Sequence, residues 1–569
     1  MKFYLLILLV SASFSAPSLS YNYQLRWASG SELNEQGIDG QGLSDYGYLE
    51  NLVAISGYIY NDWFVSLDFE YSPEPAYGAS RKDIKSMPTS FFIERQTDKL
   101  YFKLGTLNTL YGQGMALNLV HDQVRDFNNT VTGLELSFDI NDNLKILSVL
   151  GVGVIKYRSN VSFRETDLSA DARFISVGAE YYHDNTGSSA QYFFTRSSVG
   201  IGPENIYAYR GIKTSLGLDL SYRLSNADRS DGLSGGLCLL EPGSGTIFDC
   251  EISDDVISYK HDFVFDTSIG NLGLFLNAQL DRYQKIYNED FTNGYNLYMA
   301  MYSDVMGWGV TTDLKSYYSP FKLQMISSKP TVYREVNSTL LSRASHFFSY
   351  NNEHGFQINL TRYLYDDIFL NVNYAFSRRY ALDTYDANNM EPVRKGSSSI
   401  WDMENYPYSQ FFIEASGYFF EDKFFYKVGY DNYYENKCEK GIVKKNTLPL
   451  NFSFAFNDRF SLSLYSEIQQ TIEEFSSTSI FNNMNYYLAS SISYKGKFIV
   501  TLMSEAEKLE YREDYSTWSG INLTMYPLDS VQMELFYGSI KGGLVCANGV
   551  CAVQPGFVDG FKVLFRTSF

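Results

Sequence analysis

Cysteine is the residue type whose spacing most directly suggests chemistry in this chain of 569 residues. Cys546 and Cys551 flank the tight-turn dipeptide Asn548-Gly549. A zinc site or a redox dithiol would need a CxxC motif or further ligands nearby, and the sequence around these cysteines has neither. Because cysteines that face each other across a hairpin lie within disulfide range, we predict a disulfide between Cys546 and Cys551.

The remaining cysteines are Cys238, Cys250 and Cys438. We predict a second disulfide between Cys238 and Cys250, inside one polar loop, and leave Cys438 unpaired. Closing the short 546–551 loop contributes about 2 kcal/mol by restricting the unfolded chain. That amount stiffens a loop and does not decide the fold.

Histidine is the residue most often used in acid–base catalysis, and the chain has five: His121, His183, His261, His346 and His354. The first three are each followed directly by an aspartate. Neighbours in a strand point to opposite faces, so these pairs do not predict a shared site. Acidic clusters in the loops lack the ordered ligand spacing of an EF-hand. We therefore predict no catalytic residue, no metal site and no cofactor.

Residues 1–20 predict export. Lys2 is followed by an apolar run from Phe3 to Val10 and then by a small, polar stretch to Ser20, as in a cleaved secretory signal peptide. The whole chain has a net charge of −19, and removing Lys2 with the signal gives −20 for residues 21–569. This charge disfavours binding to nucleic acid, and an exported chain can hold disulfides.

Alternation of apolar and polar residues recurs along residues 21–569, as in "WFVSLDFEY" (63–71) and "LPLNFSFAF" (448–456). Each such run can cross a bilayer as a tilted strand, for which about 9 to 11 residues suffice. We expect one face to contact lipid through Val65, Leu67, Phe69, Phe452, Phe454, Val531, Met533 and Leu535. The other face should line a lumen with Ser66, Asp68, Asn451, Ser453, Gln532 and Glu534.

Tight turns alternate with long polar segments. Turn signals such as Asn61-Asp62, Asn457-Asp458 and Lys495-Gly496 join some strand pairs, and segments such as 381–407 and 541–556 join others. Short periplasmic turns and long extracellular loops are typical of outer-membrane barrels. We predict an all-β fold in which residues 21–569 form a single large antiparallel transmembrane β-barrel of about 26 strands, within 22 to 28.

The last predicted strand, "FKVLFRTSF", alternates and ends in an aromatic residue. Phe565 and Phe569 share its apolar face with Phe561 and Val563. This pattern resembles the C-terminal signal that the barrel-assembly machinery of Gram-negative bacteria recognises. We expect Phe565 and Phe569 to be that assembly signal, and we expect the assembly machinery and outer-membrane lipid to be partners.

The stretch Tyr111-Gly112-Gln113-Gly114 is too short for a dinucleotide loop, and no βαβ pattern surrounds it. Glycines here permit a β-bulge or a close approach of two backbones. Two interpretations stay open. The segment is a strand with a bulge, or residues 105–130, with Asp126, bend into the lumen and narrow it.

Two stretches carry a resemblance to a known family. "GTLNTLYGQGMALNL" (105–119), followed by Asp126 and Gly133, and "GSIKGGLVCANGVC" (538–551), with the terminal Phe569, resemble an uncharacterised family of large outer-membrane barrels from Bacteroidetes-like Gram-negative bacteria. The resemblance implies an outer-membrane location and no particular activity.

Three functions are compatible with these patterns. The first is a porin-like or gated channel for polar solutes, because a barrel of this size encloses more space than side chains fill. We expect no TonB-dependent transporter, since strand-like sequence from Tyr21 leaves no room for a plug domain. The second is a surface-binding or envelope-assembly barrel whose loops hold a secreted protein or a polysaccharide, with stacking residues Tyr385, Trp401, Tyr406 and Tyr408. The third is an outer-membrane hydrolase.

Overall fold

The fold of this protein is described here from a computed structural model. The described residues are 19–33, 43–60, 62–74, 88–122, 127–157, 168–184, 186–200, 236–238, 250–252, 256–285, 291–318, 326–334, 339–343, 346, 352–365, 368–379, 382–386, 391–394, 407–436, 441–476, 479–547, 550–554 and 556–569. Residues 1–18 of the predicted signal peptide lie outside these ranges, as do Asp126 and Cys438.

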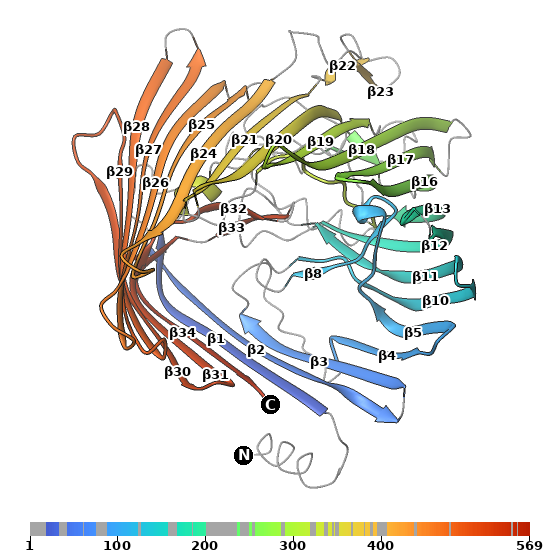
Figure 1. Ribbon diagram of the computed structural model, residues 1–569, viewed down its shortest axis with the longest axis horizontal. Coiled ribbons are helices and arrows are strands. Elements are labelled where there is room, and N and C mark those ends of the chain that lie inside the picture. The colour runs from blue at the N-terminus through green and yellow to red at the C-terminus, as the bar shows by residue number, and fades with distance from the viewer. Residues whose placement is uncertain are drawn as a thin grey trace, which may run out of the picture.

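A single antiparallel sheet of 24 strands closes on itself and forms the wall of a barrel (Figure 1). Each wall strand pairs with the next wall strand along the chain, and the last pairs with the first. The wall strands are β1 (Leu19–Leu33), β2 (Leu43–Tyr60), β3 (Trp63–Glu74), β4 (Ser90–Gln96), β5 (Leu100–Leu107), β10 (Val131–Asn141), β11 (Leu144–Tyr157), β12 (Leu168–His183), β13 (Ser188–Gly200), β16 (Val256–Ile269), β17 (Leu272–Lys285), β18 (Phe291–Val305), β19 (Trp308–Tyr318), β20 (Asn352–Tyr365), β21 (Ile368–Arg379), β24 (Pro407–Phe419), β25 (Phe424–Asn436), β26 (Ile442–Ala455), β27 (Phe460–Ser476), β28 (Ser479–Tyr494), β29 (Phe498–Lys508), β30 (Ser516–Leu528), β31 (Val531–Ile540) and β34 (Phe557–Ser568).

The predicted closed barrel is confirmed, with 24 wall strands in place of about 26. Five short strand pairs lie outside the wall sheet, and three of them lie in polar segments that the sequence assigned to loops. They are β14 (Gly236–Cys238) with β15 (Cys250–Ile252), β22 (Leu382–Asp386) with β23 (Glu391–Arg394), and β32 (Gly543–Ala547) with β33 (Val550–Gln554). A hairpin needs only local alternation and a suitable turn. A wall strand must also pair with a second strand, which can be far away in the sequence.

The seam of the barrel joins β1 to β34, with Tyr23 opposite Thr567 and Trp27 opposite Val563. At its end the backbone N–H of Tyr21 donates to Phe569 O, and the N–H of Phe569 donates to Tyr21 O, both at 2.9 Å. Closure matters because an open sheet edge leaves a row of backbone groups unpaired. The seam removes both edges.

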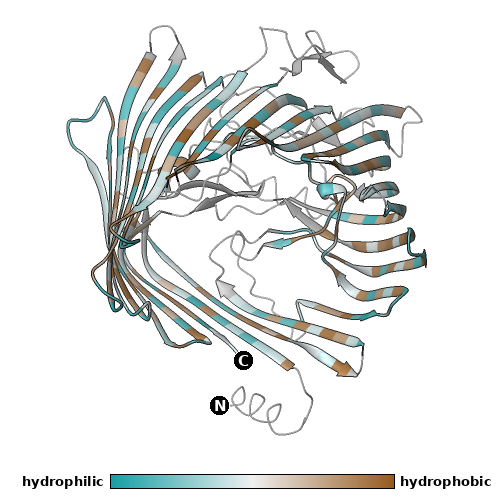
Figure 2. Cartoon of the chain, viewed as in Figure 1, coloured by the Kyte–Doolittle hydropathy of each residue, from teal (hydrophilic) through white to brown (hydrophobic). Residues whose placement is uncertain are grey.

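Polarity in this barrel is the reverse of that in a soluble protein. Charged and amide side chains such as Glu135, Gln279 and Glu353 are buried on the inner side of the wall, while Ile175, Phe263 and Leu502 are exposed on its outer side. The strands consequently change from apolar to polar residue by residue (Figure 2). Among the described residues, no helix is long and apolar enough to cross a membrane.

The outward face can be tested with two neighbours in the middle of β29. Leu502, 58% exposed, points outward, whereas Thr501 lies next to Ser491 on the inner side. We expect Leu502→Arg to block insertion into bilayers, since an arginine on the lipid face costs about 2–4 kcal/mol at mid-membrane, and Thr501→Arg to insert normally. Refolding yield in lipid vesicles measures this, and equal yields would refute the assigned facing.

Candidate functional site

The barrel interior holds a segment of the chain between β5 and β10, here called the first inner segment, residues 108–122 (Figure 1). It contains β6 (Leu110–Tyr111), the 3-10 helix η1 (Gly112–Gly114), β7 (Leu117–Asn118) and β8 (His121–Asp122), which pairs with β9 (Phe127–Asn128). Wall side chains bind its backbone: Asn277 Nδ2 donates to Gly112 O at 2.7 Å, and Gln279 Nε2 to Met115 O at 2.6 Å.

Glu135 of β10 fixes the start of the first inner segment. Its two carboxylate oxygens accept hydrogen bonds from Thr109 Oγ1 and from the Tyr111 hydroxyl, both at 2.6 Å. Burial, followed by the negative charge of Glu135, raises the pKa of Tyr111. The tyrosine therefore remains a hydrogen-bond donor at any physiological pH.

The predicted glycine stretch lies inside the barrel and makes a close backbone approach. Gly112, Gln113 and Gly114 have φ values of +58°, +51° and +87°, in the left-handed region. A Cβ on Gly114 would lie 2.8 Å from the backbone oxygen of Ser328, so a side chain would displace the neighbouring segment. Asp126, named with these residues from the sequence, lies outside the described residues.

A second segment also lies in the interior, between β19 and β20. The second inner segment comprises the described residues 326–334, 339–343 and His346, with the short helix α4 (Thr339–Ser342). Its backbone meets the first inner segment, since Asn118 N donates to Ile326 O at 2.7 Å and Ser328 N to Gly114 O at 2.8 Å. The two inner segments therefore form one layer across part of the lumen.

Polar side chains attach the beginning of the second inner segment to the wall. Lys260 Nζ donates to Ser327 Oγ at 2.6 Å, Lys315 Nζ donates to Thr331 O at 2.6 Å, and the Tyr317 hydroxyl donates to Pro330 O at 2.8 Å. These three donors come from β16 and β19. The contacts are hydrogen bonds to backbone or hydroxyl oxygens, so water can replace them.

The helix α4 is attached to the opposite part of the wall. Glu467 Oε2 on β27 accepts the backbone N–H groups of Leu340 at 2.8 Å and Leu341 at 3.1 Å. Arg343, directly after the helix, pairs with Glu505 on β29 and donates through Nη2 to Lys541 O at 3.1 Å. The final hairpin strand β32 also lies against α4.

His346 ends the described part of the second inner segment in a buried charge cluster. Its Nδ1 lies 2.7 Å from Glu435 Oε1 and its Nε2 lies 2.9 Å from Glu353 Oε1, with only 1% of the side chain exposed. Lys315 Nζ pairs with the same Glu353 oxygen at 2.5 Å. The imidazole stacks on Tyr408, with ring centroids 3.9 Å apart.

The cluster superficially resembles a hydrolase triad, because Ser377 Oγ lies 3.3 Å from His346 Nε2 and Glu435 lies at Nδ1. A general base, however, needs a nitrogen lone pair directed at the serine. Nε2 of His346 lies closer to the carboxylate of Glu353, and the whole group is buried. The geometry therefore does not support the hydrolase alternative at this cluster.

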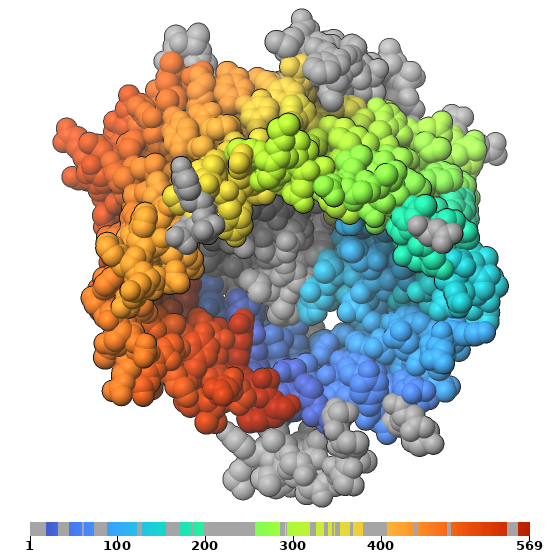
Figure 3. All heavy atoms as spheres, viewed as in Figure 1, coloured from blue at the N-terminus to red at the C-terminus, as the bar shows by residue number. Residues whose placement is uncertain are grey.

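A cavity of about 400 Å³ lies between the two inner segments and the wall. Gln113, Asn118, Asp313, Lys329 and Gln357 line it, together with Val332, which has a strained φ of +53° for a β-branched residue. Burial lowers the pKa of Lys329 well below its ordinary value, and the carboxylate of Asp281 opposes the shift. A hollow is visible at the centre of the space-filling view (Figure 3).

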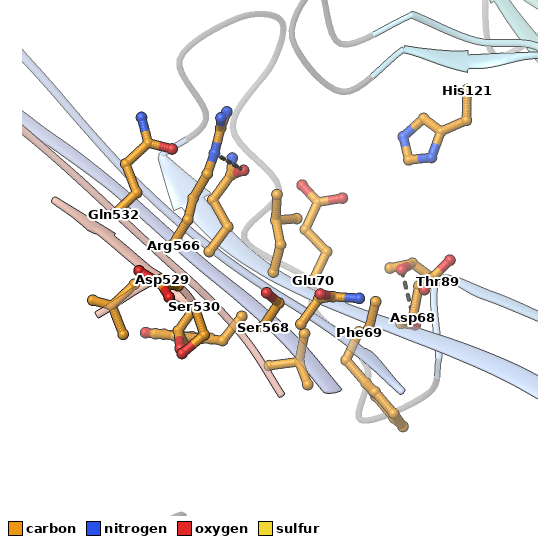
Figure 4. A pocket seen from close by; sticks show the side chains of 18 of the residues that line it. Asp68, Phe69, Glu70, Thr89, His121, Asp529, Ser530, Gln532, Arg566 and Ser568 are labelled. Atoms are coloured by element: carbon orange, nitrogen blue, oxygen red, sulfur yellow. Dashed lines mark hydrogen bonds between the residues drawn. The ribbon is translucent and has the colours of Figure 1, made fainter. Parts of the chain in front are cut away.

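A larger cavity, of about 540 Å³, extends to the tight turn at Asp529 and Ser530. Glu70, Gln532 and Arg566 project toward the side on which His121 lies, whereas Phe69 projects away (Figure 4). Both signs of charge are thus present, and Arg566 Nε donates to Gln24 Oε1 at 2.8 Å. The view agrees with the facing predicted for Phe69 and Gln532.

Some inner-wall oxygens have spare hydrogen-bonding capacity. Within the described residues, Asp262 Oδ2, Asn277 Oδ1, Asp281 Oδ1 and Asn296 Oδ1 are buried and have no hydrogen-bond partner. Buried acceptors of this kind are ordinarily hydrated. No group of three or more His, Cys, Asp or Glu residues in the described ranges could hold a metal ion.

The predicted separation of the His-Asp pairs is seen at β16. Asp262 is buried inside, where it accepts a hydrogen bond from Gln279, whereas half-buried His261 meets the Tyr192 hydroxyl at 2.8 Å on the outer side. The clustered residue whose contacts sequence reasoning missed is His346. No aspartate follows it in the sequence, and its partners are 7 and 89 residues away.

The backbone register places both predicted cysteine pairs directly opposite each other. Cys546 pairs with Cys551 in the β32–β33 hairpin, and Cys238 with Cys250 in the β14–β15 hairpin. The disulfides themselves stay predictions. The β32–β33 hairpin was expected to project outward, but it extends into the ring and lies against α4 (Figure 1).

Two further sets of predicted residues differ in outcome. Phe569 is exposed at the seam and Phe565 lies opposite Leu25 of β1, and their role as an assembly signal stays a prediction. Tyr408 was expected in a sugar-stacking loop and is instead buried in β24 against His346. The alternating pattern of β24 begins at Pro407, so Tyr408 belongs to the wall strand and not to the preceding loop. Trp401 and Tyr406 lie outside the described residues, and only the backbone of Tyr385 is described.

No protein-family model matches the chain, and no curated protein matches it. Solved structures with similar extent include the siderophore receptor PirA from Pseudomonas aeruginosa, at 8% identity and a TM-score of 0.43, covering 98% of this chain and 81% of that one. The copper transporter OprC is 8% identical with a TM-score of 0.45, and the match covers 97% of this chain and 80% of that one. The translocation pore of the P pilus usher PapC is 9% identical with a TM-score of 0.42, and the match covers 96% of this chain and 99% of that one. These values are too low to support an argument about function.

Removing the anchor of α4 should loosen the second inner segment without opening the barrel. In Glu467→Ala, two backbone N–H groups lose a charged acceptor, and such bonds contribute about 1.5–3 kcal/mol each. We expect faster amide exchange at 339–343 and unchanged exchange in β27. Glu473→Ala, on the same face of β27, serves as the control. Equal protection of α4 in both variants would contradict the anchoring role.

The predicted disulfides can be tested by mass spectrometry of an unreduced digest. We expect one peptide pair linked through Cys546 and Cys551 and another through Cys238 and Cys250, because the register places each pair face to face. Alkylation before digestion, without reductant, should label Cys438 alone. Labelled Cys546 or Cys551 would refute the first disulfide.

Proposed function

We propose that this protein is a gated channel for polar solutes in the outer membrane of a Gram-negative bacterium. The observation that carries the proposal is the polar, partly unsatisfied inner wall of a closed barrel, crossed by two segments that hydrogen bonds attach to that wall. The cavities beside these segments would form the path. Movement of the inner segments would open it.

The membrane location is supported by the physical chemistry of the wall. Apolar side chains on the outer face suit hydrocarbon, and complete pairing around the ring leaves no backbone edge unsatisfied there. The resemblance of residues 105–133 and 538–551 to an uncharacterised outer-membrane family of Bacteroidetes-like bacteria is consistent with this location.

The solute class follows from the cavity walls. Amide, hydroxyl and charged groups of both signs line the two cavities, including Gln113, Asp313 and Lys329 in one and Glu70 and Arg566 in the other. Such groups bind water and hydrogen-bonding solutes and reject apolar ones. We therefore infer passage of small polar molecules without a strong preference for one charge.

A surface-binding or envelope-assembly barrel is the second candidate. The inner segments and the β32–β33 hairpin occupy much of the interior. This favours the second candidate, because a barrel that only holds a partner with its loops needs no open lumen. The buried polar oxygens that lack a partner in the described part of the wall are not explained by this alternative, because a permanently filled interior can be apolar.

Planar-bilayer recordings test the channel. We expect small or infrequent openings from the wild type and more frequent openings from the double variant Glu467→Ala/Arg343→Ala, in which α4 loses its wall anchors. If the closed state becomes less stable by about 1.4 kcal/mol relative to the open state, the ratio of open to closed channels rises about tenfold. Glu473→Ala is again the matched control.

Two results would contradict the proposal. The first is an absence of conductance from folded protein in the wild type and in the double variant alike. The second is a stable complex with a secreted protein or polysaccharide that accounts for all of the purified barrel. Either result would favour the second candidate.

A further inference from the structure

We propose that His346 is a proton-dependent latch that holds the second inner segment against the wall, so that losing its proton releases the segment. This inference rests on the proposed function, since it names how the channel would be regulated. The latch joins the inner segment to β20 through Glu353 and to β25 through Glu435.

The ring geometry fits the charged form of the histidine between two carboxylates. A neutral imidazole has one N–H and one lone pair, whereas an imidazolium donates from both nitrogens. Both nitrogens of His346 lie within hydrogen-bond distance of a carboxylate oxygen, at 2.7 and 2.9 Å. In the neutral form, one carboxylate would face a lone pair at this distance and would be repelled.

Charge balance in the cluster leads to the same conclusion. With His346 protonated, its charge and that of Lys315 balance the carboxylates of Glu353 and Glu435. Among these four almost completely buried side chains, loss of the proton leaves a charge of −1, and Lys445 lies beside them, bound to Arg343 O. An uncompensated buried charge is strongly destabilising unless the group moves into water. Release of His346 with its segment is the movement that the anchoring contacts allow.

The surroundings keep the ring in place and contain further groups that bear on its charge. Tyr408 stacks on one face of the imidazole, and Tyr333 meets it edge-on at 5.7 Å. Tyr433 donates to Glu435, which stabilises the ionised form of that carboxylate, and Lys445 donates to Arg343 O beside the cluster. Among the described residues, the titratable and charged groups that face the latch from the packed elements include Lys315, Tyr333, Glu353, Tyr408, Tyr433, Glu435 and Lys445, and Asp431 acts on Tyr408.

A second titratable group on the same segment acts in the opposite direction. Burial lowers the pKa of Lys329, so its neutral form is favoured inside the barrel and rising pH stabilises the segment at this point. The latch at His346, in contrast, is intact while the ring is protonated and is lost as pH rises. The pH response of the wild type contains both effects, and a comparison with a His346 variant isolates the latch.

The test combines bilayer recordings with amide exchange of residues 326–346, both from pH 6 to pH 9. The wild type is expected to open more often as pH rises, by at most about tenfold per pH unit because one proton is lost. His346→Gln should lose the rise in opening with pH and retain only the opposite response that comes from Lys329. His261→Gln, which changes a histidine on the outer face, should retain the wild-type profile.

A second variant keeps the test decisive if His346→Gln folds poorly. In Glu353→Gln the cluster is neutral when His346 is unprotonated, so the rise in opening with pH should disappear or reverse. The latch is overturned if His346→Gln retains the wild-type dependence in both measurements. The two proposals can fail separately. If no conductance is seen but amide exchange at 326–346 still depends on pH and on His346, the proposed channel is overturned and the latch is retained.

Discussion

Backbone pairing around a complete ring is the constraint on which the rest of this structure depends. In hydrocarbon each unpaired N–H or C=O group costs several kcal/mol, so a sheet can face lipid only if it has no edge. The β1–β34 seam satisfies this condition across the two ends of the sheet. Once the ring is closed, its outer face must be mainly apolar, and most polar residues of the wall lie inside.

Because the outer face is apolar, the polar side chains of the wall face the barrel interior and need hydrogen-bond partners there. Glu135, Gln279 and Glu467 each bind a donor or an acceptor on an inner segment, so the inner segments satisfy the wall as much as the wall holds them. Exchanging one of these contacts for water costs only about 0.5–3 kcal/mol, because one hydrogen bond is replaced by another. An interior joined in this way is suited to two arrangements of similar stability.

The sequence predicts the wall well and the interior poorly, for a physical reason. Alternation in β3 and β26, turn signals such as Lys495-Gly496 and the alternating final strand are local patterns that report the wall strands directly. The contact of Gly114 with Ser328, and the meeting of His346 with Glu353 and Glu435, join residues from separate parts of the chain. Only the glycines hinted at the interior, since they require close backbone approach. The role of His346 had no local signal.

The attachment of the inner segments also sets an order in time. The first inner segment binds β16 and β17, which both follow it along the chain. The second binds β16 and β19 at its beginning, which precede it, and β25, β27 and β29 further on, which follow it. During synthesis and export, the second inner segment therefore has its first wall partners from the start, whereas the first inner segment must wait for all of them. The contacts of both segments are complete only after the later strands have joined the ring.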